Sequence, residues 1–183
     1  MRSLSRFILE VMGWKAVGSF PDNLKKYVVI VAPHTSGWDF VIGLLFRKAL
    51  RLERAKYLGK HQLFKPPFGF FFRWLGGYPV DRTSSHNLVD QVAKIFNDHE
   101  EFVLALSPEG TRQRVDKLKT GFYNIARKAE VPIIMVAFDY KHKQAIISPP
   151  FETTHNQQAD FERILGFFRP MEGKYPENGL MHL

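Results

Sequence analysis

The sequence predicts a single α/β domain, residues 1–183, with a largely parallel central sheet flanked by helices and an amphipathic helix at the N-terminus. Short apolar runs typical of buried strands alternate with segments of helical periodicity, an order that favours a parallel sheet. A length of 183 residues suits one domain with its own core. Apolar residues make up 45% of the chain and charged residues 24%, which is the balance of a globular protein.

The N-terminal segment, residues 1–15, predicts the amphipathic helix. Its apolar side chains follow helical spacing, at Leu4, Phe7, Ile8, Val11 and Met12. Such a helix can lie in a membrane interface, or it can dock on its own domain, and this segment alone favours neither alternative.

The rest of the chain alternates between strands and helices. Continuous apolar runs predict strands at 27–32, 56–58, 102–107, 131–138 and 144–148. Helical periodicity predicts helices at 38–50, 84–100, 120–130 and 157–168. The last residues, 171–183, predict a loosely ordered tail.

The chain carries a net charge of +8 and no cysteine. The absence of cysteine excludes disulfides, thiolate metal sites and a cysteine nucleophile. A basic chain favours an anionic partner: nucleic acid, a phosphorylated substrate or an acidic membrane surface. No stretch of the sequence reaches the roughly 18 to 20 apolar residues of a transmembrane helix, so membrane contact would be interfacial.

A histidine and an aspartate five residues apart follow the first long apolar run. On a helix or a strand, His34 and Asp39 would point in different directions, so they can meet only if the backbone turns between them. Gly37 permits a turn, and Ser36 or Thr35 can cap the helix that follows. The turn would then hold an imidazole against a carboxylate, as in a general base and its orienting group. The alternative is a surface turn with an incidental His/Asp pair.

The segment SPEGTRQR, residues 107–114, follows a second buried strand. Gly110 allows the backbone to approach a ligand, and Arg112 has a planar guanidinium suited to phosphate, although a surface ion pair is the alternative for an arginine. Glu109 is first a candidate for holding the turn together and second a functional group. Because ligands bind beyond the carboxyl ends of parallel strands, these residues and His34 can meet at one edge of the sheet.

Residues 59–82 interleave basic and aromatic side chains. Aromatic residues such as Phe71 and Trp74 could stack on nucleobases, anchor at a bilayer interface, or form the core side of a helix. The segment ends in GGYPVDR, which predicts a turn that delivers Arg82.

Several motifs, in this order, resemble those of the glycerolipid acyltransferase family, of the lysophosphatidic acid (1-acylglycerol-3-phosphate) acyltransferase type: His-x4-Asp after a strand, GGYPVDR, PEGTR, KTGFYNIA and VPIIMVAF. They lie within residues 27–138. The resemblance implies transfer of a fatty acyl chain from acyl-CoA or acyl-ACP to a hydroxyl of a glycerol phosphate or lysophospholipid. Tyr78 departs from the pattern, because many members have an aliphatic residue there.

The resemblance also implies a role for each matching residue. His34 matches the catalytic base and Asp39 its orienting carboxylate. The residues that match acceptor and phosphate binding are Glu109, Gly110, Thr111, Arg112, Arg82 and Lys60. Pro132 matches a proline associated with the acyl-donor side. No metal and no cofactor are expected, since acyl-CoA or acyl carrier protein enters as a co-substrate.

An enzyme of this kind would meet its lipid acceptor at an anionic membrane surface. We therefore expect a cytoplasmic protein, peripheral on the inner face of the cell membrane, with no nucleic acid among its partners. The residues expected to face the membrane are Leu4, Phe7, Ile8, Val11, Phe71 and Trp74.

The residues themselves favour direct attack by the acceptor. The chain lacks cysteine and a G-x-S-x-G elbow, so a covalent acyl-enzyme is not supported, and backbone N–H groups after Ser36 are candidate oxyanion donors. Three other functions fit the sequence less well. A metal-dependent hydrolase lacks H-E-x-x-H spacing, and a nucleic-acid-binding domain lacks the familiar signatures. A non-catalytic lipid-binding member of the family is disfavoured by the presence of both His34 and Asp39.

Overall fold

The computed structural model describes residues 2–80 and 85–183, and it confirms the predicted α/β domain. The sheet has seven strands in the order β1-β7-β6-β2-β5-β3-β4. Neighbouring strands are parallel except β6 and β7, which are antiparallel. The strands are β1 Lys15–Val17, β2 Lys26–Ala32, β3 Ala55–Lys60, β4 Gly77–Val80, β5 Phe102–Leu106, β6 Ile133–Asp139 and β7 Gln144–Ile147.

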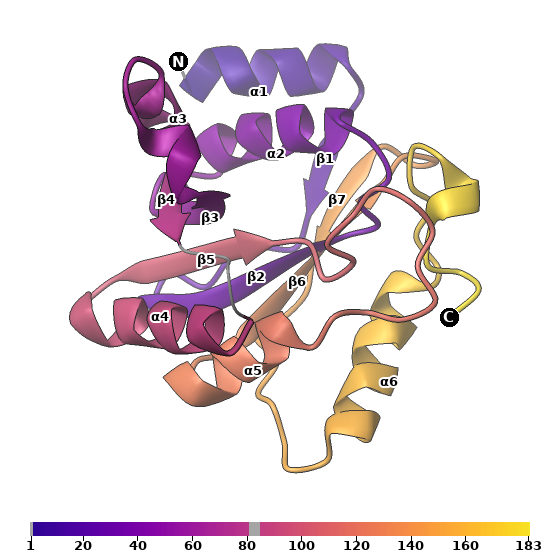
Figure 1. Cartoon of the computed structure of the whole chain (residues 1–183). Helices are drawn as coiled ribbons and strands as arrows, with labels where there is room; N and C mark the ends of the chain where they lie inside the picture. Colours follow the sequence, from indigo (N-terminus) through magenta and orange to yellow (C-terminus); the bar gives the residue numbers. More distant parts are fainter. Residues whose placement is uncertain (1, 81–84) are drawn as a thin grey trace.

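Helices cover both faces of the sheet (Figure 1). The helices are α1 Arg2–Val11, α2 Trp38–Ala49, α3 Gly69–Trp74, α4 Ser85–Asp98, α5 Gly121–Ala129 and α6 Gln157–Phe168. Two short 3₁₀ turns, η1 His61–Phe64 and η2 Pro176–Asn178, lie before α3 and near the C-terminus. One core cluster joins the sheet to α1 and α2, and the other joins it to α4, α5 and α6.

The alternation of side chains along β2 explains the two clusters. Val28 and Ile30 pack on the side of α4 and α5, whereas Tyr27 and Val29 pack on the side of α1 and α2. A strand buried on both faces reads as a continuous apolar run, which is why the run YVVIVA predicted it.

Helix α1 both docks on the domain and keeps an apolar face in solvent. Ser5 and Leu9 are buried against α2, and Ile8 is half-buried. Leu4, Phe7 and Val11 remain exposed, and 71% of Val11 is accessible. None of the helices in the described part of the chain has the length and apolar character that crossing a membrane requires.

Three elements differ from the predictions. Strand β1 was not predicted, and helix α3 was only one of three alternatives for its segment. The segment GGYPV was predicted as a turn, whereas Gly77–Val80 pairs with β3 as edge strand β4. A proline disfavours a strand inside a sheet but is tolerated in an edge strand. For this reason the sequence of this segment did not predict a strand.

Residues 171–183 were predicted to form a loosely ordered tail, but in the structure they pack on the domain. Leu180 is fully buried in the core cluster of α5 and α6, and the Tyr175 N–H donates to the Thr35 hydroxyl (3.1 Å). The tail is held because its apolar side chain fills the core, a contact that local composition cannot reveal.

Candidate active site

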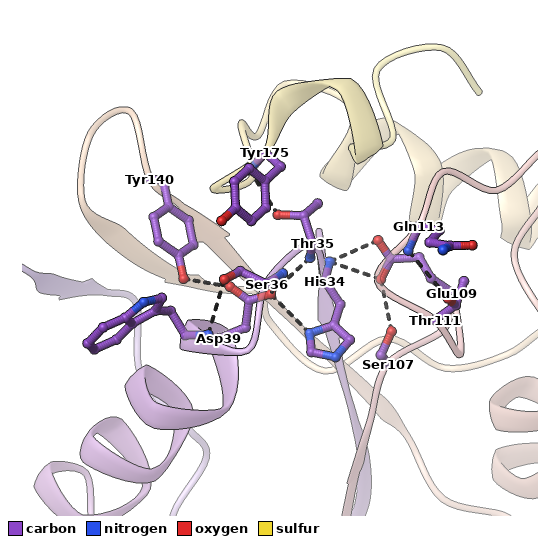
Figure 2. A network of polar contacts seen from close by, with 11 residues as sticks. His34, Thr35, Ser36, Asp39, Ser107, Glu109, Thr111, Gln113, Tyr140 and Tyr175 are labelled. Carbon is purple, nitrogen blue, oxygen red and sulfur yellow. Dashed lines mark hydrogen bonds and ion pairs between the residues drawn. The ribbon is translucent and has the colours of Figure 1, made fainter.

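The turn between β2 and α2 brings His34 and Asp39 together, as predicted. His34 Nδ1 lies 3.0 Å from Asp39 Oδ2, and the N–H groups of Thr35 and Ser36 each donate to the same oxygen at 2.9 Å (Figure 2). The Ser36 hydroxyl accepts from the Trp38 N–H at 3.2 Å, at the start of α2. The carboxylate therefore closes the turn and orients the imidazole at the same time.

Glu109 supports the same turn from the end of β5. Its carboxylate accepts from the His34 backbone N–H at 2.9 and 3.1 Å and from the Ser107 hydroxyl at 2.9 Å. Only 1% of the residue is accessible, and this burial raises the pKa of Glu109 above its usual value despite the hydrogen bonds that lower it. The Glu109 carboxylate therefore supports the turn that carries His34, whereas the sequence predicted that it holds the turn of its own segment, residues 107–114.

Asp39 sits in an environment that favours its ionised form. Burial alone would raise the pKa of Asp39, but hydrogen bonds from His34, the Tyr140 hydroxyl and the Ser36 N–H outweigh it and lower the pKa. The Tyr140 hydroxyl donates to Asp39 Oδ1 at 2.5 Å. The imidazole of His34 thus faces a permanent negative charge near neutral pH.

Arg112 is exposed and reaches the helix start beside His34. A Cβ atom placed on Gly37 would lie 3.9 Å from a guanidinium nitrogen of Arg112. Gly110 has a φ of +66°, and a Cβ atom there would come within 2.9 Å of the Lys119 side chain. The turn therefore depends on a glycine at this position, and it brings two cationic side chains to the site.

A cavity of about 1040 Å³ opens beside the His/Asp pair. His34, Asp39, Arg112 and Lys119 line it together with many apolar side chains, which include Val29, Val31, Phe40, Leu44, Phe46, Phe138 and Ile147. Gly43 of α2 also lines the cavity, and because it has no side chain, the helix backbone itself forms the cavity wall at that point. A polar mouth that leads to apolar walls suits an amphipathic molecule with a charged group and a hydrocarbon chain.

Comparison with known proteins gives the family. A family model described as Acyltransferase matches residues 16–139, more than half of the chain. The chain belongs to the Acyltransferase family.

Among curated proteins, none matches this acyltransferase. The solved structure of the 1-acyl-sn-glycerophosphate (LPA) acyltransferase PlsC from Thermotoga maritima is similar to it, with a TM-score of 0.62 and 16% sequence identity. The match covers 91% of the present chain and 74% of that chain. At this level of identity the likeness shows a shared fold.

Two further predicted site residues of the acyltransferase lie at the same edge of the sheet as the His/Asp pair. Thr111 follows Gly110 at the cavity rim, where its hydroxyl accepts from the Gln113 N–H (3.3 Å). Lys60 is exposed at the carboxyl end of β3, on the same edge of the sheet. Arg82 lies outside the described residues.

Pro132 is not brought to the site. It is buried before the first residue of β6, where its carbonyl accepts from the Val28 N–H (2.9 Å). Since β2 and β6 are parallel, Pro132 lies at the opposite end of the sheet from His34. A residue at this position does not contact the His/Asp pair, so the structure does not support a role for Pro132 there.

Sequence reasoning missed Tyr140 and Ser107 in the acyltransferase. Tyr140 contacts a carboxylate 101 positions earlier in the chain, which no local pattern can reveal. The available signal was the exit of a third buried strand, AFDYK, since polar residues there reach the same sheet edge. Within residues 2–80 and 85–183, no three acidic or histidine side chains converge as a metal site would require.

Proposed function

We propose that this acyltransferase moves a fatty acyl chain from acyl-CoA or acyl-ACP to a hydroxyl of a glycerol phosphate or lysophospholipid, with His34 as general base. The observation that carries the proposal is the His34–Asp39 pair, 3.0 Å apart, at the polar mouth of an apolar cavity. The LPA acyltransferase named for the similar fold supports the choice of acceptor class.

The hydrogen bond to Asp39 places the Nδ1 proton of His34 toward the carboxylate and leaves Nε2 to act as the base. Nε2 would take the proton of the acceptor hydroxyl while the hydroxyl oxygen bonds to the thioester carbonyl carbon. The carbon–sulfur bond then breaks, and the leaving thiolate receives that proton from His34. Because the N–H groups of Thr35 and Ser36 already donate to Asp39, they are occupied and do not serve as oxyanion donors.

The proposal is tested by incubating the purified protein with acyl-CoA and lysophosphatidate and measuring thiol release with a chromogenic disulfide. Release that depends on the acceptor supports acyl transfer. Release that is equally fast without an acceptor would instead indicate a thioesterase, and no release with a panel of donors and acceptors would contradict the proposal.

Arg112 is proposed to hold the acceptor's phosphate, and Arg82 to assist it. Replacing Arg112 with glutamine is expected to raise the acceptor KM about tenfold or more, since hydrogen bonds to charged groups contribute roughly 1.5–3 kcal/mol. The donor KM should change much less. Arg114→Gln is the matched control, because Arg114 is exposed two positions along the same turn. A phosphate-free acceptor that proves the better substrate would contradict the phosphate role.

The apolar part of the cavity is proposed to hold an acyl chain. Gly43→Leu is expected to lower kcat/KM for palmitoyl-CoA about tenfold relative to octanoyl-CoA, because keeping two methylenes out of apolar surroundings costs about 0.8 kcal/mol each. Gly43→Ala should be tolerated, since its Cβ atom would lie 3.8 Å from Phe138. Gly166→Leu, in an exposed part of α6, controls for replacing a helical glycine. An unchanged chain preference in Gly43→Leu would exclude this part of the cavity.

The exposed apolar side chains of α1 and α3 are proposed to lie in the membrane interface, on the inner face of the cell membrane. They include the predicted Leu4, Phe7 and Val11 of α1 and Phe71 and Trp74 of α3, to which the structure adds Phe70, 74% accessible. Both helices lie in the upper part of Figure 1. Basic side chains flank them, at Arg2, Arg6, Lys65 and Arg73.

Serine at Phe70 and Trp74, or at Phe7 and Val11, is expected to weaken binding to anionic vesicles at least tenfold, since a fully buried large apolar side chain contributes about 1.5–3 kcal/mol. Added salt should weaken wild-type binding further, because each basic residue near an anionic surface contributes about 1 kcal/mol. Co-sedimentation measures both effects. Met181→Ser is the control, because Met181 is exposed near the C-terminus. Folded serine variants that sediment like the wild type would exclude the interfacial role.

A further inference from the structure

Tyr140 reaches the candidate active site from a third strand. Strands β2 and β6 are parallel neighbours, with Ala32 paired to Ala137. The residues that follow these pairs, His34 and Tyr140, therefore come out at the same edge of the sheet. The Tyr140 hydroxyl donates to Asp39 Oδ1 at 2.5 Å (Figure 2).

The two oxygens of the Asp39 carboxylate have different partners. Oδ2 accepts from the His34 ring and from the N–H groups of Thr35 and Ser36. A carboxylate turns about its Cβ–Cγ bond, and contacts to one oxygen restrain this rotation from one side only. The hydrogen bond from Tyr140 to Oδ1 restrains it from the other side as well, and with it the direction in which Oδ2 faces His34.

Tyr140 is itself held on two sides. The Trp14 ring packs edge-on against the Tyr140 ring, with centroids 5.0 Å apart and an angle of 89°. The Tyr140 N–H donates to the Glu172 carbonyl at 2.9 Å. These three residues lie outside residues 16–139, the part of the chain that the family model matches. They come from the N-terminal segment, the β6–β7 connection and the C-terminal tail, so this arrangement is built by parts of the chain beyond the shared motifs.

We propose that Tyr140 is a positioning residue, which orients Asp39 so that His34 keeps its proton on Nδ1 and its Nε2 free to act as a base. The consequence for the rate rests on the proposed general-base function, whereas the consequence for the tautomer does not. Burial and the hydrogen bond to Asp39 raise the pKa of Tyr140 above its usual range, so the phenol stays protonated and acts as the donor.

The test is Tyr140→Phe, which removes the hydroxyl and keeps the ring that packs on Trp14. Nitrogen-15 NMR of the imidazole of His34 reports which ring nitrogen carries the proton. In the wild type we expect the Nδ1–H tautomer, and in Tyr140→Phe a mixture in which the two ring-nitrogen shifts move toward each other. We also expect kcat to fall about tenfold, as for other groups that orient a catalytic side chain, with both KM values within about twofold.

Tyr123→Phe is the matched control. Tyr123 is buried, and its hydroxyl donates to the buried carboxylate of Asp160 at 2.8 Å, so the same kind of bond is removed far from His34. This variant should lose thermal stability while the tautomer and kcat stay as in the wild type. A purely structural Tyr140 would behave in the same way as Tyr123, and that result would overturn the proposal.

Two further outcomes are informative. If Tyr140→Phe does not fold, 3-fluorotyrosine placed at position 140 keeps the shape and makes the hydroxyl more acidic. The ring-nitrogen shifts of His34 should then move, and unchanged shifts would overturn the proposal. If the wild type transfers no acyl chain but the tautomer changes in Tyr140→Phe, the positioning role stands and the proposed function fails.

Discussion

Replacing His34 with alanine is expected to lower kcat for acyl transfer by about 10²–10⁴-fold, the usual contribution of a positioned general base. The acceptor hydroxyl is a poor nucleophile near neutral pH, and an alanine side chain cannot take its proton. The backbone N–H of residue 34, which donates to Glu109, is kept, so circular dichroism and thermal denaturation should show a folded protein.

A second His/Asp pair in the chain provides the control for this experiment. His142 Nδ1 lies 2.5 Å from Asp139 Oδ2, and Asp139 is buried as Asp39 is. His142 is exposed on the β6–β7 connection. His142→Ala should therefore keep full acyl transfer, so that a loss confined to His34→Ala identifies the base. Full activity in His34→Ala would end the general-base assignment.

Replacing Asp39 with asparagine is expected to lower kcat by a comparable factor, about 10²–10⁴-fold, with smaller changes in both KM values. Asparagine has nearly the same shape, but its neutral amide cannot stabilise the imidazolium that forms during proton transfer. Besides His34, three groups donate to the carboxylate: the Thr35 and Ser36 N–H groups and the Tyr140 hydroxyl. An asparagine can accept from them only through its single oxygen. Steady-state kinetics of both substrates give the split between kcat and KM.

Asp160→Asn separates the loss of catalysis from the loss of a buried carboxylate. Asp160 is fully buried and accepts hydrogen bonds from Tyr123 and Thr154 in the α6 region. This variant should be less stable and as active as the wild type at a temperature where it is folded. If Asp39→Asn also lost stability only, the carboxylate would be a structural group of the turn.

The His34–Asp39 contact could be predicted from sequence because the turn is local. Four residues separate the pair, Gly37 lies between them, and the preceding strand is a continuous apolar run that shows where the sheet ends. The proximity of Glu109 to His34 could be predicted in the same way, because it follows a second such run that ends at the same edge, but its hydrogen bond with the His34 N–H could not.

The remaining features depend on contacts between distant parts of the chain. Strand β4 was missed because Pro79 disfavours a strand everywhere except at an edge, and edge position is a property of the whole sheet. The packing of Leu180 and the contact of Tyr140 with Asp39 join segments that lie far apart in the sequence. For Pro132, the family resemblance implied a role on the acyl-donor side, whereas the parallel direction of β6 places the residue at the opposite end of the sheet from His34.

The proposed reaction of this chain joins a thioester-borne acyl chain to the hydroxyl of a phosphate-bearing glycerolipid. Mass spectrometry of wild-type reactions, with several acyl-CoA and acyl-ACP donors crossed with glycerol 3-phosphate and lysophospholipid acceptors, measures this directly. We expect a new product whose mass is that of the acceptor plus the acyl group, formed only when both substrates are present and absent with His34→Ala. Formation of free fatty acid alone, or of the same product at the same rate by His34→Ala, would contradict the account.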